Sequence, residues 1–254
     1  MSTDFIPGIY NYCDRWCERC PFTARCLLFA REKTYFGDKK EHDLQSETFW
    51  KTMQQIFSDT KTLILRAAEE HGIDLNAVDQ EELDCTMKAM ARTDHQVRRH
   101  PLVVQATRYS ACVEKWFEQH ASAFEEKGDQ LVSLELMQLS GYDPEAEAIS
   151  LADACEVVRW YQHQIAVKFS RALSSDGERE LFDEEAMHTD SLGSAKVALL
   201  GIDRSLAAWT ILREAFPDHA DETLDVLVNL TQLRRAAEIH FPNARAFLRP
   251  GLDG

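Results

Sequence analysis

Residues 150–173, SLADACEVVRWYQHQIAVKFSRAL, carry apolar side chains at intervals of three and four. This spacing places the side chains on one face of an α-helix, which turns once every 3.6 residues or so. The expected buried face consists of Ala154, Val157, Val158, Tyr161, Ile165, Phe169 and Leu173. Ser150 followed by Asp153 has the pattern of a capping box, so we expect this helix to begin near Ser150.

Five further segments show the same period and predict helices. They are residues 49–71, 78–92, 103–124, 194–216 and 226–237. Gly72, Pro101 and Pro217 stand where helix boundaries are expected, and residues 176–190 are expected to form an acidic loop. Strict apolar and polar alternation is not sustained anywhere, which argues against strands. The pattern therefore predicts an all-α fold, a bundle of about six helices.

The composition argues against several kinds of partner. The 254 residues include 28 Lys and Arg against 43 Asp and Glu, a net charge of −15. Nucleic acid and anionic membranes are poor partners for such a chain, because binding phosphates requires clustered cations. The longest apolar run covers residues 197–202, far fewer than the roughly 20 residues that span a bilayer. The first residues lack the pattern of a secretory signal, so we expect a cytoplasmic protein.

The sequence predicts two domains of different character. Residues 1–40 carry seven Lys and Arg against five acids and hold four of the seven cysteines. Residues 41–254 carry the acidic excess and the helical periodicity. We therefore expect a small cysteine-rich metal-binding module at 1–40 and an acidic helical bundle at 41–254.

The four cysteines of the first segment are Cys13, Cys17, Cys20 and Cys26, with the spacing C-x3-C-x2-C-x5-C. Loops of two to five residues allow four thiolates to converge on one ion or cluster. Structural zinc sites usually have two short cysteine pairs separated by a longer insert, which this segment lacks. Pro21 follows Cys20, as a proline follows a ligand in ferredoxin-type segments. These features favour an iron–sulfur cluster over zinc.

The first three cysteines resemble the C-x3-C-x2-C segment of radical S-adenosylmethionine enzymes. The last three are similar to the auxiliary-cluster segments of those enzymes, and this resemblance implies a fully ligated [4Fe-4S] cluster. It covers only the cysteine segment, because the β/α barrel and glycine-rich segment of the family are missing. The stretches IYNYCDRWCERCPFTARC and SAKVALLGIDRSLAAW also resemble two pieces that recur in a bacterial protein family of no established function.

One alternative to a metal centre remains for this segment, and its arginines have two interpretations. Cys13, Cys17 and Cys20 lie at i, i+4 and i+7, so they also fit one buried face of a helix. Arg15, Arg19 and Arg25 either offset the negative charge of the thiolates or form a solvated rim.

The helical segments offer weaker candidates for a polar site. The only Glu-x-x-His motif, Glu185 to His188, lies in the acidic stretch, whereas a di-metal carboxylate bundle requires two such motifs. Glu156 and His163 share a face with Trp160 and Val167, opposite the main apolar face, and we expect both to point inward. Lys196 and Asp203 are their expected partners. Interhelical ion pairs or solvent exposure are favoured over a proton-handling or ligand pocket.

The sequence supports three hypotheses about function. The first is a protein that carries one [4Fe-4S] cluster for electron transfer or partner binding, with a protein or redox partner. The second is a zinc-stapled structural or interaction protein. The third is a metal-assisted enzyme that uses Glu156, His163, Lys196 and Asp203.

Overall fold

The structure is a computed structural model that describes residues 4–37, 45–75, 77, 79–138 and 141–253. Helices contain 79% of these described residues, and no strand occurs among them. The all-α prediction is therefore confirmed. The described part of the chain has eight α-helices rather than about six. No helix within it is both long and apolar enough to cross a membrane.

The α-helices are α1 (Leu27–Phe36), α2 (Glu47–Glu70), α3 (Gln80–Arg99), α4 (Pro101–Gln119), α5 (Ala121–Met137), α6 (Pro144–Gly177), α7 (Glu184–Ala215) and α8 (Ala220–His240). The short 3-10 helices are η1 (Cys17–Arg19), η2 (Thr23–Arg25), η4 (Pro217–His219) and η5 (Ala244–Ala246). These elements form two compact units, which we call unit 1 (residues 1–89 and 249–254) and unit 2 (residues 90–248). The expected boundary after residue 40 lies within 38–44, outside the described residues, so it stays a prediction.

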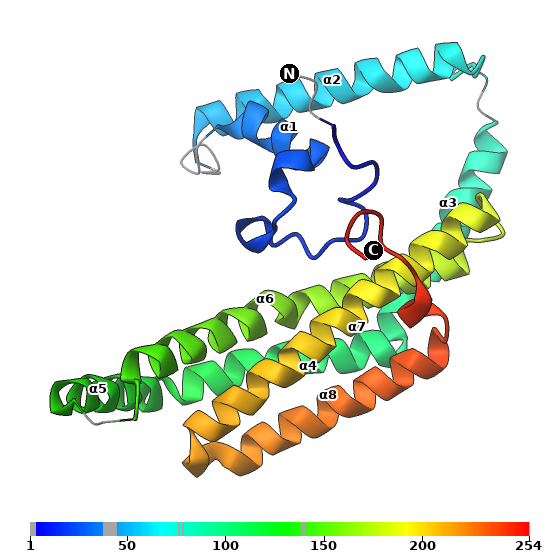
Figure 1. The fold of residues 1–254 in the computed structure, drawn as a ribbon. Helices are drawn as coiled ribbons and strands as arrows, with labels where there is room; N and C mark the ends of the chain where they lie inside the picture. The colour runs from blue at the N-terminus through cyan, green and yellow to red at the C-terminus, as the bar shows by residue number, and fades with distance from the viewer. Residues whose placement is uncertain (1–3, 38–44, 76, 78, 139–140, 254) are drawn as a thin grey trace. The chain divides into compact units, whose positions relative to one another are not determined.

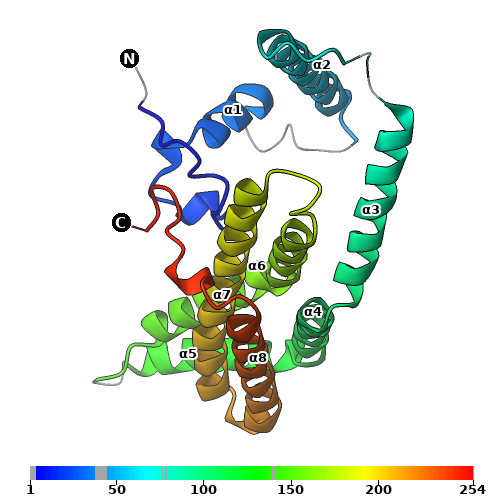
Figure 2. The ribbon, with the colours of Figure 1, turned by 90° about the vertical axis from the view of Figure 1, so that its right-hand side faces the viewer.

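Unit 2 is a helical bundle built around α4, α6, α7 and α8. Helix α6 contacts both α4 and α7, and α8 contacts the same two helices, so the four close a ring. The long helices α6 and α7 lie side by side over most of their length (Figures 1 and 2). Val158, Ile165 and Phe169 of α6 are fully buried, as is Trp209 of α7. The apolar face predicted for residues 150–173 therefore forms the core of the bundle.

Side-chain caps explain why α6 and α7 begin earlier than expected. The Asp143 carboxylate accepts a hydrogen bond from the Ala146 amide at 3.0 Å, and Pro144 occupies the first turn. The helix therefore begins at Pro144, and Ser150 lies inside it. Asp183 caps α7 in the same way. Most of residues 176–190 is consequently helical, and the expected acidic loop is wrong.

The two additional helices arise from one break and one short segment. The helix expected over residues 103–124 is interrupted at His120, which ends α4 and precedes α5. Helix α1 directly follows Cys26, and its short length and weak amphipathicity explain why periodicity missed it.

In unit 1, α1 contacts α2 through the Tyr35 hydroxyl, which donates to Asp59 Oδ2 at 2.8 Å. The segment before the cysteines is held by its backbone, since the Ile6 amide donates to the Arg25 carbonyl at 3.0 Å. The turn at 249–253 packs against the same segment, and Gly251 adopts a positive φ beside Ile6. Residues from both ends of the described chain therefore meet in unit 1.

Candidate functional site

The four clustered cysteines occupy loops and 3-10 turns. Cys13 precedes η1, Cys17 is its first residue and Cys20 directly follows it. Cys26 connects η2 to α1. A single α-helix does not run through this segment, so the alternative of one buried helix face is wrong. The backbone reverses at Arg15, whose φ of 58° lies in the left-handed region, a conformation that costs energy in a residue other than glycine.

All four cysteines line the same small cavity of about 30 Å³. Its other walls include the apolar side chains of Ile9, Phe29 and Leu252. The cysteines are half-buried rather than exposed. Apolar walls and partial burial exclude water from sulfur ligands, which is one means by which proteins tune an iron–sulfur centre.

The pKa of Cys17 reflects both its burial and its negatively charged surroundings. Burial raises the pKa of Cys17 to about 11, and Glu32 and the thiols of Cys13, Cys20 and Cys26 add to the increase. Four thiolates brought together therefore repel one another unless a cationic centre lies among them.

The three arginines of the segment lie in different settings. Arg15 lines the cysteine cavity. The Arg19 guanidinium lies over the Trp16 ring, 3.9 Å from its centroid, and Arg25 Nε donates to the Asp4 carbonyl at 3.3 Å. Arg19 and Arg25 thus have partners other than the thiols, and Arg15 is exposed at the edge of the cavity.

The four sulfur atoms are not closely grouped. No three of the four Sγ atoms lie within 4.8 Å of one another, whereas bonds of about 2.3 Å to one zinc ion place tetrahedral thiolates about 3.8 Å apart. A single zinc ion would therefore require the cysteine loops to close around it.

The turn at 249–253 closes one side of the cysteine cavity with Leu252. Arg249 holds this turn, because its guanidinium donates to both carboxylate oxygens of Asp253, at 3.0 and 2.7 Å. Both side chains of this pair are largely buried. The turn is therefore a fixed part of the cavity wall, which sequence reasoning missed because it lies so far along the chain from the cysteines.

The expected inward placement of Glu156 and His163 is wrong, since both residues are exposed. Val167, which was taken to mark an apolar face, is 63% exposed. The His163 ring lies 2.7 Å from Ser110 Oγ and 3.4 Å from a Glu114 carboxylate oxygen. The face opposite the main stripe of α6 is thus largely a solvent-facing surface, and its apolar residues do not mark a second core.

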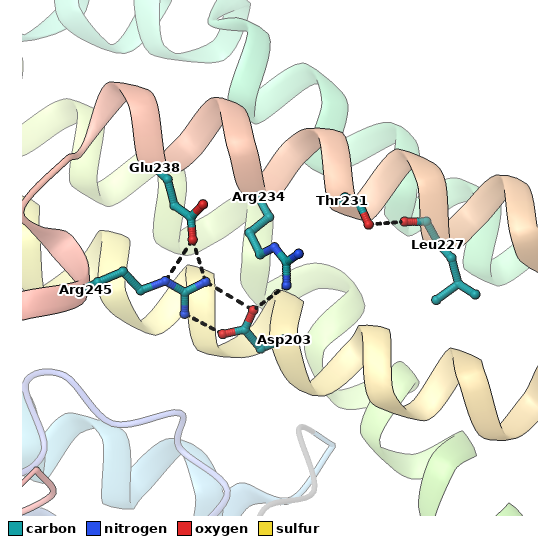
Figure 3. Close-up of polar contacts among 6 residues, drawn as sticks. All are labelled: Asp203, Leu227, Thr231, Arg234, Glu238 and Arg245. Carbon is teal, nitrogen blue, oxygen red and sulfur yellow. Dashed lines mark hydrogen bonds and ion pairs between the residues drawn. The ribbon is translucent and has the colours of Figure 1, made fainter.

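Lys196 and Asp203 hold the segment that follows α8. Lys196 Nζ donates to the Arg245 carbonyl at 3.1 Å and to the Phe247 carbonyl at 2.7 Å. The Asp203 carboxylate accepts from the Arg245 guanidinium, which also pairs with Glu238 (Figure 3). Arg234 completes the network in Figure 3, with Nη1 3.5 Å from Asp203 Oδ1. The printed contacts of Lys196 and Asp203 therefore hold the segment after α8 against α7.

One group of potential metal ligands was missed by sequence reasoning. His120, His219 and Glu222 each present one ligand atom, and these atoms lie within 4.8 Å of one another. The three residues come from the α4–α5 junction and the beginning of α8. The His-x-x-Glu spacing of residues 219 and 222 is the only part of this group visible in the sequence.

No protein-family model, curated protein or solved structure matches this chain.

Proposed function

We propose that Cys13, Cys17, Cys20 and Cys26 bind one iron–sulfur cluster, of the [4Fe-4S] type, and that the protein uses it for electron transfer or to present a partner-binding surface. One observation carries the proposal: four cysteines within a fourteen-residue stretch line a single cavity with apolar walls. The C-x3-C-x2-C-x5-C spacing without a long insert, and Pro21 after Cys20, favour a cluster over a single zinc ion.

When bound, such a cluster supplies one-electron chemistry and needs no catalytic side chain. The chain contributes the four thiolates, and Ile9, Phe29 and Leu252 limit the access of water to them. The left-handed backbone of Arg15 reverses the short loop between Cys13 and Cys17, and both of these cysteines line the cavity.

The free space of about 30 Å³ is close to the volume that one water molecule occupies. We therefore expect η1 and η2 to shift outward when a cluster binds. Trp16 lies between Cys13 and Cys17 and lines the cavity, so it reports this shift. Near-ultraviolet circular dichroism of Trp16 should change when the cluster is reconstituted into the apoprotein.

Anaerobic purification of the full chain tests the proposal directly. We expect a brown protein with four iron and four acid-labile sulfide per chain, and an electron paramagnetic resonance signal that appears on reduction. Cys17→Ser should remove most of the iron, because four ligands leave no spare donor.

The matched control is Cys85→Ser, which changes an exposed cysteine of α3 and should leave the iron content unchanged. A colourless protein with one zinc ion per chain, lost in Cys17→Ser, would instead establish the zinc-stapled alternative. Metal-free protein after anaerobic reconstitution with iron and sulfide would contradict both kinds of metal centre.

A further inference from the structure

We infer that His120, His219 and Glu222 form a second, independent site for a divalent transition-metal ion such as Zn²⁺. The site lies in unit 2, where α4 meets α5 and η4 leads into α8. Two imidazoles and one carboxylate are a ligand set that binds zinc and other first-row metals and leaves coordination positions open. The inference does not depend on the cysteine centre.

The orientation of His120 is fixed before any metal binds. Its Nδ1 lies 2.7 Å from the Trp116 carbonyl oxygen, which only accepts, so Nδ1 carries a proton. The ring is stacked on Trp116 with centroids 4.9 Å apart, and the residue is only 7% exposed. Nε2 is therefore the nitrogen available to a metal, and a backbone carbonyl holds the opposite nitrogen, as is usual for metal-binding histidines.

The separation of the ligand atoms matches a shared ion. His120 Nε2 lies 3.2 Å from a Glu222 carboxylate oxygen. Metal–ligand bonds of about 2.1 Å place neighbouring ligand atoms about 3.0 to 3.4 Å apart in octahedral or tetrahedral geometry. The His219 ring also lies close to this pair, with its centroid 4.0 Å from that of His120.

A cation between His120 and Glu222 would remove an electrostatic repulsion between them. A neutral His120 presents the lone pair of Nε2 to a carboxylate oxygen, and two acceptors at this distance repel each other. Either a proton on Nε2 or a metal ion between the two atoms removes the repulsion. His219 as a third ligand atom within 4.8 Å favours the metal, because a proton shared by His120 and Glu222 makes no use of a second imidazole.

The site is buried on one side and open on the other. His120 rests on the aromatic cluster in which Trp116 contacts Trp209 and Phe216. The Glu222 side chain is 56% exposed. The bound ion therefore keeps at least one position toward solvent, which water fills, and it ties the α4–α5 junction to the beginning of α8.

The test is a calorimetric titration of the full-length protein, purified anaerobically, with Zn²⁺. Wild type should bind one zinc ion in addition to the contents of its cysteine centre. Glu222→Gln and His219→Gln should each weaken this binding by at least about tenfold, since each removes a direct ligand and loss of even a supporting contact costs that much. Both residues are at least partly exposed, so these variants avoid disturbing the core as a change at His120 would.

Two controls separate this site from the cysteine centre. Glu118→Gln changes an exposed carboxylate near the end of α4 and should bind zinc as wild type does. Cys17→Ser should also keep the zinc site of His120, His219 and Glu222. A failure of the zinc inference can therefore be told apart from a failure of the iron–sulfur proposal. Co²⁺ at this site should show visible d–d bands that disappear in Glu222→Gln, without sulfur-to-cobalt charge transfer.

Equal zinc binding by wild type, Glu222→Gln and His219→Gln would overturn the inference, as would the absence of any additional zinc site in wild type. In either case the contact between His120 and Glu222 joins the two helix ends without a metal ion.

Discussion

Tyr109 and Trp209 form a polar contact at the centre of unit 2, where water has no access. The indole Nε1 of Trp209 donates to the Tyr109 hydroxyl at 3.1 Å. Trp209 is 0% exposed and Tyr109 5%. A buried donor that loses its acceptor retains the full cost of desolvation, so this contact fixes how α4 and α7 pack.

We expect Tyr109→Phe to lower the free energy of unfolding by about 1 to 3 kcal/mol, because the Trp209 indole is left without its acceptor. Urea denaturation followed by tryptophan fluorescence measures the change. Tyr142→Phe is the matched control, since Tyr142 is 38% exposed. A loss no greater in Tyr109→Phe than in Tyr142→Phe would show that the buried bond is energetically unimportant.

The same hydroxyl makes stability depend on alkaline pH. Burial raises the pKa of Tyr109 from its ordinary value of 10.0 to about 12. A pKa raised by folding means that the unfolded chain ionises first, so stability is complete below pH 10.0 and decreases as the pH rises toward 12. Tyr109→Phe should flatten the fall in melting temperature across this range relative to wild type. An unchanged alkaline slope would assign the fall to other groups.

At the scale of elements, the contact between α6 and α7 depends on a glycine. A Cβ atom built on Gly201 would lie 2.9 Å from Tyr161 Cδ1 and 3.2 Å from Ile165 Cγ1. All three residues are buried, so neither neighbour has room to move away. The two longest helices therefore approach closely because this position has no side chain.

Gly201→Ala should destabilise unit 2 by about 1 to 3 kcal/mol, since overpacking exceeds the gain in helix propensity. Gly128→Ala is the matched control, because Gly128 lies in α5 with no heavy atom within 4 Å of the added Cβ. That control should instead gain about 0.5 to 1 kcal/mol. Chemical denaturation followed by circular dichroism measures the change in the free energy of unfolding of both variants. A change of the same sign in the two variants would contradict the close-packing explanation.

Helix α2 differs sharply from α7 in burial. Of its 24 residues only Ala68 is buried, whereas α7 buries thirteen, among them Leu199 and Trp209. Amide protection follows such differences, because weakly packed helices open without global unfolding. Hydrogen exchange with mass spectrometry should therefore show α2 exchanging far faster than α7. Comparable protection in the two helices would show that a partner or a second copy covers α2.

How much the sequence predicted depends on where each signal lies. Periodicity identified the buried face of α6 because each of its residues lies one turn from the next. The ends of α6 and α7 were missed because Asp143 and Asp183 cap them through single hydrogen bonds. The group of His120, His219 and Glu222 was also missed, because it combines the α4–α5 junction with the beginning of α8, which lie far apart in the sequence. Trp160 and Val167 suggested an inward face of α6, but apolar side chains also occur singly on protein surfaces.

At the scale of the whole molecule, the cysteine centre depends on residues from both ends of the sequence. Leu252 lines the cavity, and the Arg249–Asp253 pair holds its turn in place. Deletion of residues 249–254 should speed the loss of iron in air several-fold, because water and oxygen then reach the sulfurs. The melting of unit 2, followed by circular dichroism, should change little.

Leu252→Ala tests the same point with a single side chain and should bleach faster than wild type. Leu248→Ala is the control, because Leu248 is 72% exposed and does not line the cavity. Equal rates of bleaching in the two variants would show that the turn does not shield the cysteines.

The position of Leu252 also sets an order of events during protein synthesis. The ribosome adds the four cysteines early, but the wall of their cavity is complete only after residues 249–253 have left the exit tunnel. Thiols on the nascent chain are therefore unprotected throughout translation of unit 2. On the iron–sulfur proposal, a cluster assembled before residues 249–253 emerge would lie in a cavity that still lacks its Leu252 wall.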